Sequence, residues 1–144
     1  MILSASAHAN ATFVALTEAP EVTWLSEVVE LATAKRGGAA LLTTLLDGLE
    51  LKDAVATAIS QGELWALKVN DATIGLALIR AGVISALYIV PAWRRQGLAS
   101  DFVTTLQAAG VEVIDGLALP GDRATKSLYE SLGWKARLLT MRSS

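Results

Sequence analysis

A basic turn followed by small residues is the part of this sequence whose residue types best fit a chemical task. It follows an apolar run that ends at Pro91, contains Arg94 and Arg95, and reaches Gly97 where a helical pattern starts. The first turn of a helix has backbone N–H groups without intrahelical partners and the positive end of the helix dipole, so it attracts anions. Because glycine has no Cβ, an anion can approach the backbone closely at Gly97. The segment predicts a phosphate site, and a diphosphate fits several amides and cations better than a single carboxylate does.

The same turn also has a purely structural interpretation. Glycine is common near the start of a helix, so a short glycine motif has little specificity by itself. Arginine-rich turns are often only solvated at the protein surface. On local chemistry alone, a phosphate site and a plain strand-to-helix turn are equal alternatives.

Two motifs, separated as they are in a known family, favour the phosphate site. Arg94-x-x-Gly97-x-Ala99, preceded by Leu87-Tyr88-Ile89-Val90-Pro91, resembles the acyl-CoA-binding motif Gln/Arg-x-x-Gly-x-Gly/Ala of the GNAT superfamily of N-acyltransferases. Further along, the segment from Asp122 to Trp134 resembles the family's late helix, which usually reads Asn, then Ala, then Leu-Tyr, then Gly-Phe. The resemblance extends from Glu63 to Met141, and two motifs at the right separation are more specific than either alone.

The resemblance implies a fold and a set of site residues. The fold class is α/β, with a central mixed sheet flanked by helices, and the strand before the first motif separates from its neighbour. The backbone at Leu87 and Ile89 would then pair with the pantetheine amides of acetyl-CoA. Tyr129 matches the tyrosine often assigned to protonate the departing thiolate. The diphosphate would bind to backbone amides and to an arginine of the turn, within the set Arg94, Arg95, Gln96, Gly97, Leu98, Ala99 and Ser100.

The implied function is transfer of an acetyl group from acetyl-CoA to a primary amine of a small molecule or a protein. The amine must be neutral to attack, and a lysine-type amine has a pKa near ~10.4, so it must lose a proton. The N–H of Ile89 is the candidate donor to the thioester carbonyl. A non-catalytic module that binds coenzyme A is the alternative function. A toxin-like transferase acting on charged tRNA is disfavoured, because the chain is slightly acidic and lacks a strongly basic face.

The general base is the weakest part of the match. Ser85 stands on the predicted third strand where some relatives carry a glutamate. Glu63, at the start of the first hairpin strand, is the candidate base, directly or through water, against the alternative that it is a solvated surface residue. Tyr129 also has an alternative role, as a packing residue of an amphipathic helix. His8, the only histidine, is expected to lie in a flexible N-terminus and is rejected as a catalyst.

The second motif departs from the family pattern at two positions. Asp122 stands in place of the asparagine, and because aspartate is an equally good N-cap, the helix start is retained. Since a carboxylate is unwelcome beside a phosphorylated cofactor, we expect Asp122 to face solvent or to hold Arg123. Thr125 occupies the place of the family's alanine.

Periodicity and turn residues predict the elements that position these residues. Asn70-Asp71 and Ala81-Gly82 are turn pairs, so the three middle strands form an antiparallel meander. The connection after Val90 is a strand–helix–strand crossover, which predicts a right-handed parallel pairing. The expected elements are a short strand at 12–16, a helix capped by Thr23 and ending near Arg36, helices at 39–46 and 51–60, strands at 64–69, 73–80 and 83–90, a helix at 96–109, a strand at 111–119, a helix at 122–132 and a strand at 134–141.

Composition limits the remaining possibilities. The 144 residues are 53% apolar and 18% charged, which predicts one compact domain, with a mostly helical acceptor-side part at 1–62 and a cofactor-binding core at 63–141. The net charge of −2 disfavours a non-specific nucleic-acid binder. No apolar run approaches the ~20 residues of a membrane-spanning helix. We expect a soluble, cytoplasmic protein that binds no metal, and its exposed last strand is compatible with a homodimer.

Overall fold

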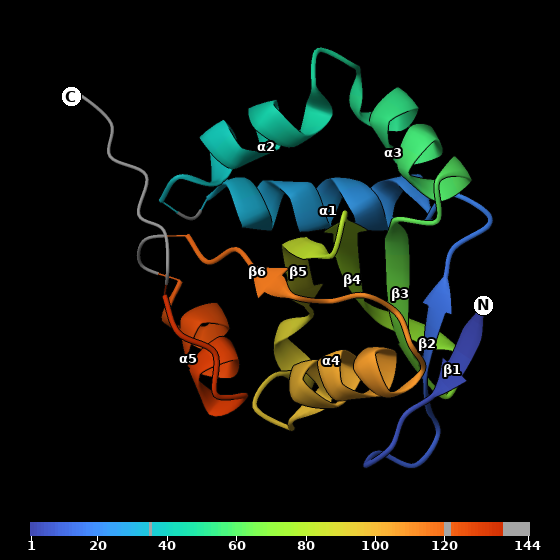
Figure 1. Cartoon of the computed structure of the whole chain (residues 1–144). Coiled ribbons are helices and arrows are strands. Elements are labelled where there is room, and N and C mark those ends of the chain that lie inside the picture. The colour runs from blue at the N-terminus through green and yellow to red at the C-terminus, as the bar shows by residue number, and fades with distance from the viewer. Residues whose placement is uncertain (35, 120–121, 137–144) are drawn as a thin grey trace.

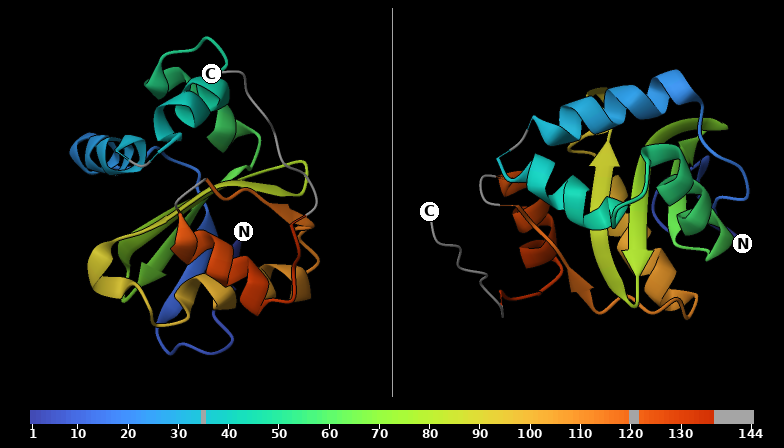
Figure 2. Two further views of the ribbon diagram at one scale, coloured as in Figure 1. Left: turned by 90° about the vertical axis from the view of Figure 1, so that its left-hand side faces the viewer. Right: turned by 90° about the horizontal axis from the view of Figure 1, so that it is seen from above.

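The computed structural model describes residues 1–34, 36–119 and 122–136. Within these residues the strands form one six-stranded sheet whose order follows the chain. Helices α1, α2 and α3 cover one face of the sheet, and α4 and α5 cover the other (Figures 1 and 2). The elements are β1 (Ile2–Ser4), β2 (Ala11–Ala15), α1 (Val22–Thr33), α2 (Gly38–Leu46), α3 (Leu51–Ser60), β3 (Leu64–Val69), β4 (Ala72–Arg80), β5 (Val83–Ile89), a 3₁₀ turn η1 (Pro91–Trp93), α4 (Leu98–Ala108), β6 (Asp115–Gly116) and α5 (Arg123–Ser131).

The central strands are buried on both faces, so their sequences read as continuous apolar runs. In β3, Trp65 and Leu67 face α4, while Leu64 and Ala66 face the N-terminal helices. The α4 side is the larger core and centres on Phe102, which makes an edge-to-face contact with Phe13 at 5.2 Å between ring centroids. Two apolar layers therefore fix the sheet between its helices.

Left-handed backbone at two tight turns sets the register of the meander. Asn70 and Asp71 have φ values of 50° and 67°, and Ala81 and Gly82 have values of 49° and 77°. Positive φ at both central residues is the two-residue hairpin turn whose twist matches that of the flanking strands. The antiparallel pairs β3–β4 and β4–β5 follow directly.

Most predicted elements are confirmed, and the differences have local causes. The helices at 39–46 and 51–60 and the three strands of the meander lie where predicted, within two residues at each end. The prediction that Thr23 caps α1 was wrong. The carboxylate of Glu21, and not the side chain of Thr23, accepts from the backbone N–H groups of Thr23 and Trp24 (both 3.3 Å). The N-terminal part also contains the β1–β2 hairpin in addition to its helices.

Two C-terminal predictions need correction. The strand expected at 111–119 is wrong except for Asp115 and Gly116, which pair in parallel with Val83 and Ile84. Beyond that point the chain leaves the sheet, so its remaining backbone makes no ladder. The strand expected at 134–141 lies mostly outside the described residues, and residues 134–136 are not in a strand. Within the described part of the chain, no helix has the length and apolar character to cross a membrane.

Candidate functional site

β5 and β6 separate after a short pairing, and this leaves one edge of β5 open. The last bond between them is from the Leu117 N–H to the Ile84 carbonyl, at 3.0 Å. Val90 N–H donates to Ile74 O of β4 (2.9 Å). Because bonding groups alternate along an antiparallel strand, the backbone of Tyr88 faces β4, while that of Leu87 and Ile89 faces the open edge. The structure thus places both predicted backbone positions where an extended ligand can pair with them.

The predicted phosphate turn presents unpaired backbone donors. The first helical bond of α4 runs from Asp101 N–H to Gly97 O at 3.0 Å. Among the described residues, no acceptor is bonded to the consecutive backbone N–H groups from Arg95 to Ser100. Arg95 and Gly97 have φ values of 63° and 76°, and left-handed residues in such a turn direct successive N–H groups into one anion-binding concavity.

Gly97 leaves space for a ligand at the centre of this turn. A Cβ placed there would have one neighbour within 4 Å, the Cε1 atom of His8 at 3.7 Å. The turn is one wall of a cleft of about 660 Å³, which is within the usual range for ligand sites. The other walls are the end of β5 and the first two turns of α5, and we call this the α4–α5 cleft. Its described lining includes Leu87, Ile89, Arg94, Arg95, Gly97, Leu98, Ala99, Ser100, Asp122, Arg123, Thr125 and Leu128.

The two arginines of the turn have different surroundings. Arg94 donates from Nε to the carbonyl of Ile89 (2.7 Å), and its guanidinium lies 5.4 Å from the ring centroid of Tyr88. Arg94 therefore ties the turn to β5. The side chains of Arg95 and Arg123 line opposite walls of the cleft, and no bond or ion pair involves either guanidinium within the described part of the chain. Arg123 was not predicted, and its signal was a basic residue directly after the N-cap of α5.

A second cavity meets the α4–α5 cleft at β5. It has a volume of about 210 Å³ and lies between the sheet and helices α1, α2 and α3. Leu87, Tyr88, Asp122 and Thr125 line both cavities. A ligand that extends along the open edge of β5 therefore reaches the entrance of this second cavity.

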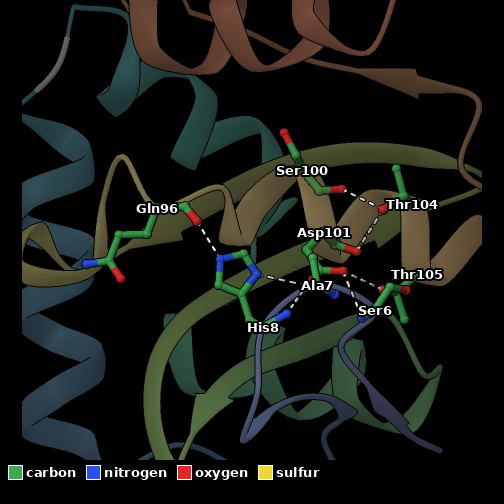
Figure 3. A network of polar contacts seen from close by, with 8 residues as sticks. All are labelled: Ser6, Ala7, His8, Gln96, Ser100, Asp101, Thr104 and Thr105. Atoms are coloured by element: carbon green, nitrogen blue, oxygen red, sulfur yellow. Dashed lines mark hydrogen bonds and ion pairs between the residues drawn. The ribbon is translucent and has the colours of Figure 1, made fainter.

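His8 anchors the phosphate turn from below, contrary to the flexible segment expected (Figure 3). Its Nδ1 atom lies 2.9 Å from Asp101 Oδ2, and its Nε2 atom bonds to the carbonyl oxygen of Gln96. Both partners are acceptors only, so both ring nitrogens must donate, which requires the protonated imidazolium. The carboxylate of Asp101, in the first turn of α4, also accepts from the N–H groups of Ser6, Ala7 and His8.

The charges in this network stabilise each other. The hydrogen bond to Asp101 and the bond to the Gln96 carbonyl raise the pKa of His8. Burial opposes the charge of Asp101, but the bonds from His8, Ala7, Thr105 and Ser6 outweigh it and lower its pKa. The imidazolium therefore balances a buried carboxylate directly under the exposed amides of the turn, where an uncompensated negative charge would repel a phosphate.

His8 should make stability depend on pH. A raised pKa in the folded state means that the stabilisation is complete below pH ~6.5 and is lost as pH rises through the folded pKa. His8→Gln should lower the free energy of unfolding by roughly 1.5–3 kcal/mol at pH 6, the range for hydrogen bonds to charged groups. The difference should shrink by pH 9. Urea denaturation of both proteins from pH 5.5 to 9 measures it, and parallel pH profiles would contradict the imidazolium assignment.

Tyr129 lies in the core beside the cleft and does not line it. Its side chain is 7% exposed, stacks on Trp134 at 5.2 Å between ring centroids, and packs against Gly116, where a Cβ would meet the ring at 2.2 Å. Its hydroxyl is buried without a hydrogen-bond partner among the described residues. Burial, with a smaller contribution from the charge of Asp122, raises the pKa of Tyr129 well above its usual value. The phenol therefore keeps its proton.

The predicted base is not brought to either cavity. Glu63 Oε1 lies 3.2 Å from Arg80 Nε at the end of β3, and Glu63 is absent from the described lining of both cavities. Ser85 is buried on β5 and lines the second cavity. Asp122 was expected to face solvent or to hold Arg123, but its carboxylate accepts from Thr125 N (3.3 Å) and Thr125 Oγ1 (2.7 Å). The threonine that replaces the family's alanine therefore completes the helix cap.

Comparisons with known proteins agree with this geometry. A family model described as an acetyltransferase (GNAT) domain matches residues 33–140. Among solved structures, a possible acetyltransferase from Clostridium difficile 630 aligns with a TM-score of 0.53 at 12% identity, covering 93% of this chain and 96% of that one. An aminoglycoside acetyltransferase from an uncultured soil metagenomic sample gives 0.52 at 15% identity, covering 86% and 91%. No curated protein sequence matches this one.

A further solved structure adds a ligand to the comparison. A predicted acetyltransferase from Clostridium acetobutylicum, determined with acetyl-CoA, aligns with a TM-score of 0.50 at 11% identity and covers 100% of this chain and 96% of that one. At such identities these neighbours establish the shared fold.

Within the described residues, no cluster of histidine, aspartate and glutamate is arranged to hold a metal ion.

Proposed function

Because this chain belongs to the family of GNAT acetyltransferases, we propose that it moves an acetyl group from acetyl-CoA directly to a primary amine. The observation that carries the proposal is the convergence of two sets of free backbone groups on one cleft. The N–H groups from Arg95 to Ser100 suit a diphosphate. The open edge at Leu87 and the N–H of Ile89 suit an extended amide chain, while the Ile89 carbonyl is held by Arg94. A pantetheine diphosphate needs these two features side by side.

The binding roles follow from the positions of the side chains. The diphosphate binds to the amides of the turn, with the guanidinium of Arg95 on one wall and that of Arg123 on the other. Arg94 acts mainly through its bond to the Ile89 carbonyl, which holds the turn against β5. The pantetheine amides pair with the backbone of Leu87, and the N–H of Ile89 is assigned to the thioester carbonyl.

The chemistry that acetyl-CoA supplies is an activated thioester. The amine nitrogen forms a bond to the acetyl carbon, the carbon–sulfur bond breaks, and the proton lost by nitrogen ends on the sulfur. The N–H of Ile89 polarises the carbonyl. Tyr129 is the proposed proton donor to the sulfur, a role that requires its buried hydroxyl to reach the cleft, which it does not line in this structure. Its hydroxyl, which has no partner among the described residues, supports this role, because a buried hydroxyl without a partner costs about 1–3 kcal/mol and a catalytic role is one explanation for such a group.

The structure brings no carboxylate from β3 or β5 to the thioester position among the lining of the two cavities that it describes. Glu63 could act only through a chain of waters, since it is paired with Arg80 and does not line either cavity. The acceptor lies on the side of residues 1–62, whose helices form much of the second cavity. Direct transfer is consistent with this arrangement, because the two cavities meet at Leu87 and Tyr88.

The proposed function is tested by incubating the protein with acetyl-CoA and a panel of primary amines while following free thiol. We expect amine-dependent thiol release, with the acetylated amine identified by mass spectrometry. Hydrolysis of acetyl-CoA without an amine is the control. Binding of coenzyme A with no acetylation across the panel, from pH 6 to 9, would contradict the transferase and favour a binding module.

A further inference from the structure

The cavity between the sheet and helices α1, α2 and α3 has a lining that restricts the chemical class of acceptor that can bind there. We call it the apolar pocket. Leucine and valine side chains from all three helices meet the inner face of β3, β4 and β5 there. The described apolar lining includes Val28, Leu42, Leu45, Val55, Leu78 and Ala86.

Few charges face this pocket. Among its described lining residues, Arg80 and Asp122 are the groups that carry a formal charge at neutral pH. Arg80 is paired, since its Nε bonds to Glu63 (3.2 Å) and its Nη1 to the Leu45 carbonyl (3.2 Å). Asp122 lies where the pocket joins the α4–α5 cleft, because it lines both. The interior is therefore apolar and a carboxylate stands at its entrance.

The volume indicates the size of the part of the acceptor that the pocket holds. The pocket measures about 210 Å³, and an apolar cavity of roughly 150 Å³ binds benzene. One aromatic ring or a branched alkyl chain fits with a short linker to spare. A polyamine or an aminosugar would bury several ammonium groups without partners, which is strongly unfavourable.

We propose that the acceptor is a small primary amine whose body is a single aromatic ring or a branched alkyl chain, bound in the apolar pocket. This inference rests on the proposed acetyl transfer and names its acceptor class. The body of the amine packs among the leucines of α2, and the nitrogen lies at the junction formed by Leu87, Tyr88 and Asp122. There it faces the end of the open edge of β5, where the thioester is placed.

The apolar surroundings also bear on the missing base. Removing an ammonium from water disfavours its charged form and lowers the pKa of the amine. The nearby carboxylate of Asp122 acts in the opposite direction, because a negative charge favours the ammonium. Water at the entrance is the acceptor of the proton that the amine releases.

The test compares matched amines with acetyl-CoA at saturating concentration. The probes are 2-phenylethylamine and 3-methylbutylamine, against ethanolamine, spermidine, kanamycin and a lysine-containing peptide. Burial of one apolar side-chain equivalent predicts a kcat/KM for the first two that is at least about tenfold higher than that for ethanolamine. Octanoyl-CoA with ethanolamine tests whether the pocket instead takes a long acyl chain.

Two substitutions test whether the apolar pocket causes the preference for apolar amines. Ala86→Leu places a larger side chain in the pocket and should raise the KM for 2-phenylethylamine about tenfold while leaving the KM for acetyl-CoA unchanged. Leu42→Ala should enlarge the pocket and shift the preference toward bulkier amines such as 4-phenylbutylamine. Ala72→Leu, at an exposed position on β4, is the matched control and should change neither constant.

The outcomes of these assays distinguish failure of the acceptor inference from failure of the proposed acetyl transfer. Preference for spermidine, kanamycin or the peptide would overturn the acceptor class and leave acetyl transfer intact. Preference for octanoyl-CoA, lost in Ala86→Leu, would assign the pocket to the acyl chain and likewise overturn it. Absence of both coenzyme A binding and thiol release would remove the proposed function itself, and the acceptor inference with it.

Discussion

Gly97→Glu should abolish the binding of coenzyme A, weakening it by at least about a hundredfold. Two like charges about 4 Å apart repel by roughly 4 kcal/mol at the effective dielectric constant of a protein surface, and each 1.4 kcal/mol is about tenfold in affinity. The new carboxylate would stand among the amides from Arg95 to Ser100, beside the diphosphate. It would also compete for the same amides and for the imidazolium of His8. Isothermal calorimetry with coenzyme A measures the loss.

A matched control separates charge from backbone strain. Gly97 and Gly48 have φ values of 76° and 80°, so a side chain is strained at both positions, by roughly 1–2 kcal/mol. A Cβ added at Gly48 would meet no atom within 4 Å, and Gly48 lies outside the described lining of the cleft, so Gly48→Glu should lose stability but keep its affinity. Ala99→Glu, in the first turn of α4, should lose affinity without that strain. Wild-type affinity in Ala99→Glu would contradict the placement of the diphosphate.

Tyr129→Phe should reduce kcat by roughly a hundredfold, the usual contribution of a positioned proton donor. The KM for acetyl-CoA should stay within about twofold, because the ring does not line the cleft. The free energy of unfolding should not fall, since the hydroxyl has no hydrogen-bond partner to lose among the described residues. Because burial raises the pKa of Tyr129, the hydroxyl should keep its proton above pH 10. Ionisation of this residue should therefore cause no decrease in turnover below pH 10.

The packing role of Tyr129 predicts a different pattern. If the ring acts only in the core, Tyr129→Phe keeps full turnover. Trp134→Leu is the companion variant, because it removes the stacked ring at 5.2 Å and leaves the hydroxyl in place. It should lower the free energy of unfolding by about 1–3 kcal/mol and change kcat little. Full activity in Tyr129→Phe would eliminate the proton-donor assignment.

Local patterns were sufficient to predict the meander and the start of α4. Asn70, Asp71 and Gly82 adopt the left-handed backbone that their residue types favour, Ala81 adopts it against its type, and the strands of the meander flank both turns. Gly97, left-handed directly before α4, lies where the motif predicts it. These features depend on residues that are close together in the sequence, so they can be predicted from the sequence alone.

Features that depend on distant residues were not predictable in this way. His8 is 93 residues from Asp101, and nothing near it in the sequence indicates an ion pair. The apolar run at 111–119 has strand composition, yet most of it leaves the sheet where β5 and β6 separate. Arg123 reaches the cleft only because the first turns of α5 form the wall that faces the start of α4. The candidate site was therefore predicted where it is local, at the turn, and missed where other elements complete it.

The central claim is that free amides of the phosphate turn bind a diphosphate, and calorimetry with the native protein tests it most directly. Coenzyme A should bind one to one, with affinity that falls as salt rises, because Arg95 and Arg123 contribute charge. Pantetheine, which has the same thiol arm but lacks the diphosphate and the adenosine 3′-phosphate, should bind at least about a hundredfold more weakly. Equal affinity for the two compounds, or no detectable association of coenzyme A with the folded protein, would contradict the account.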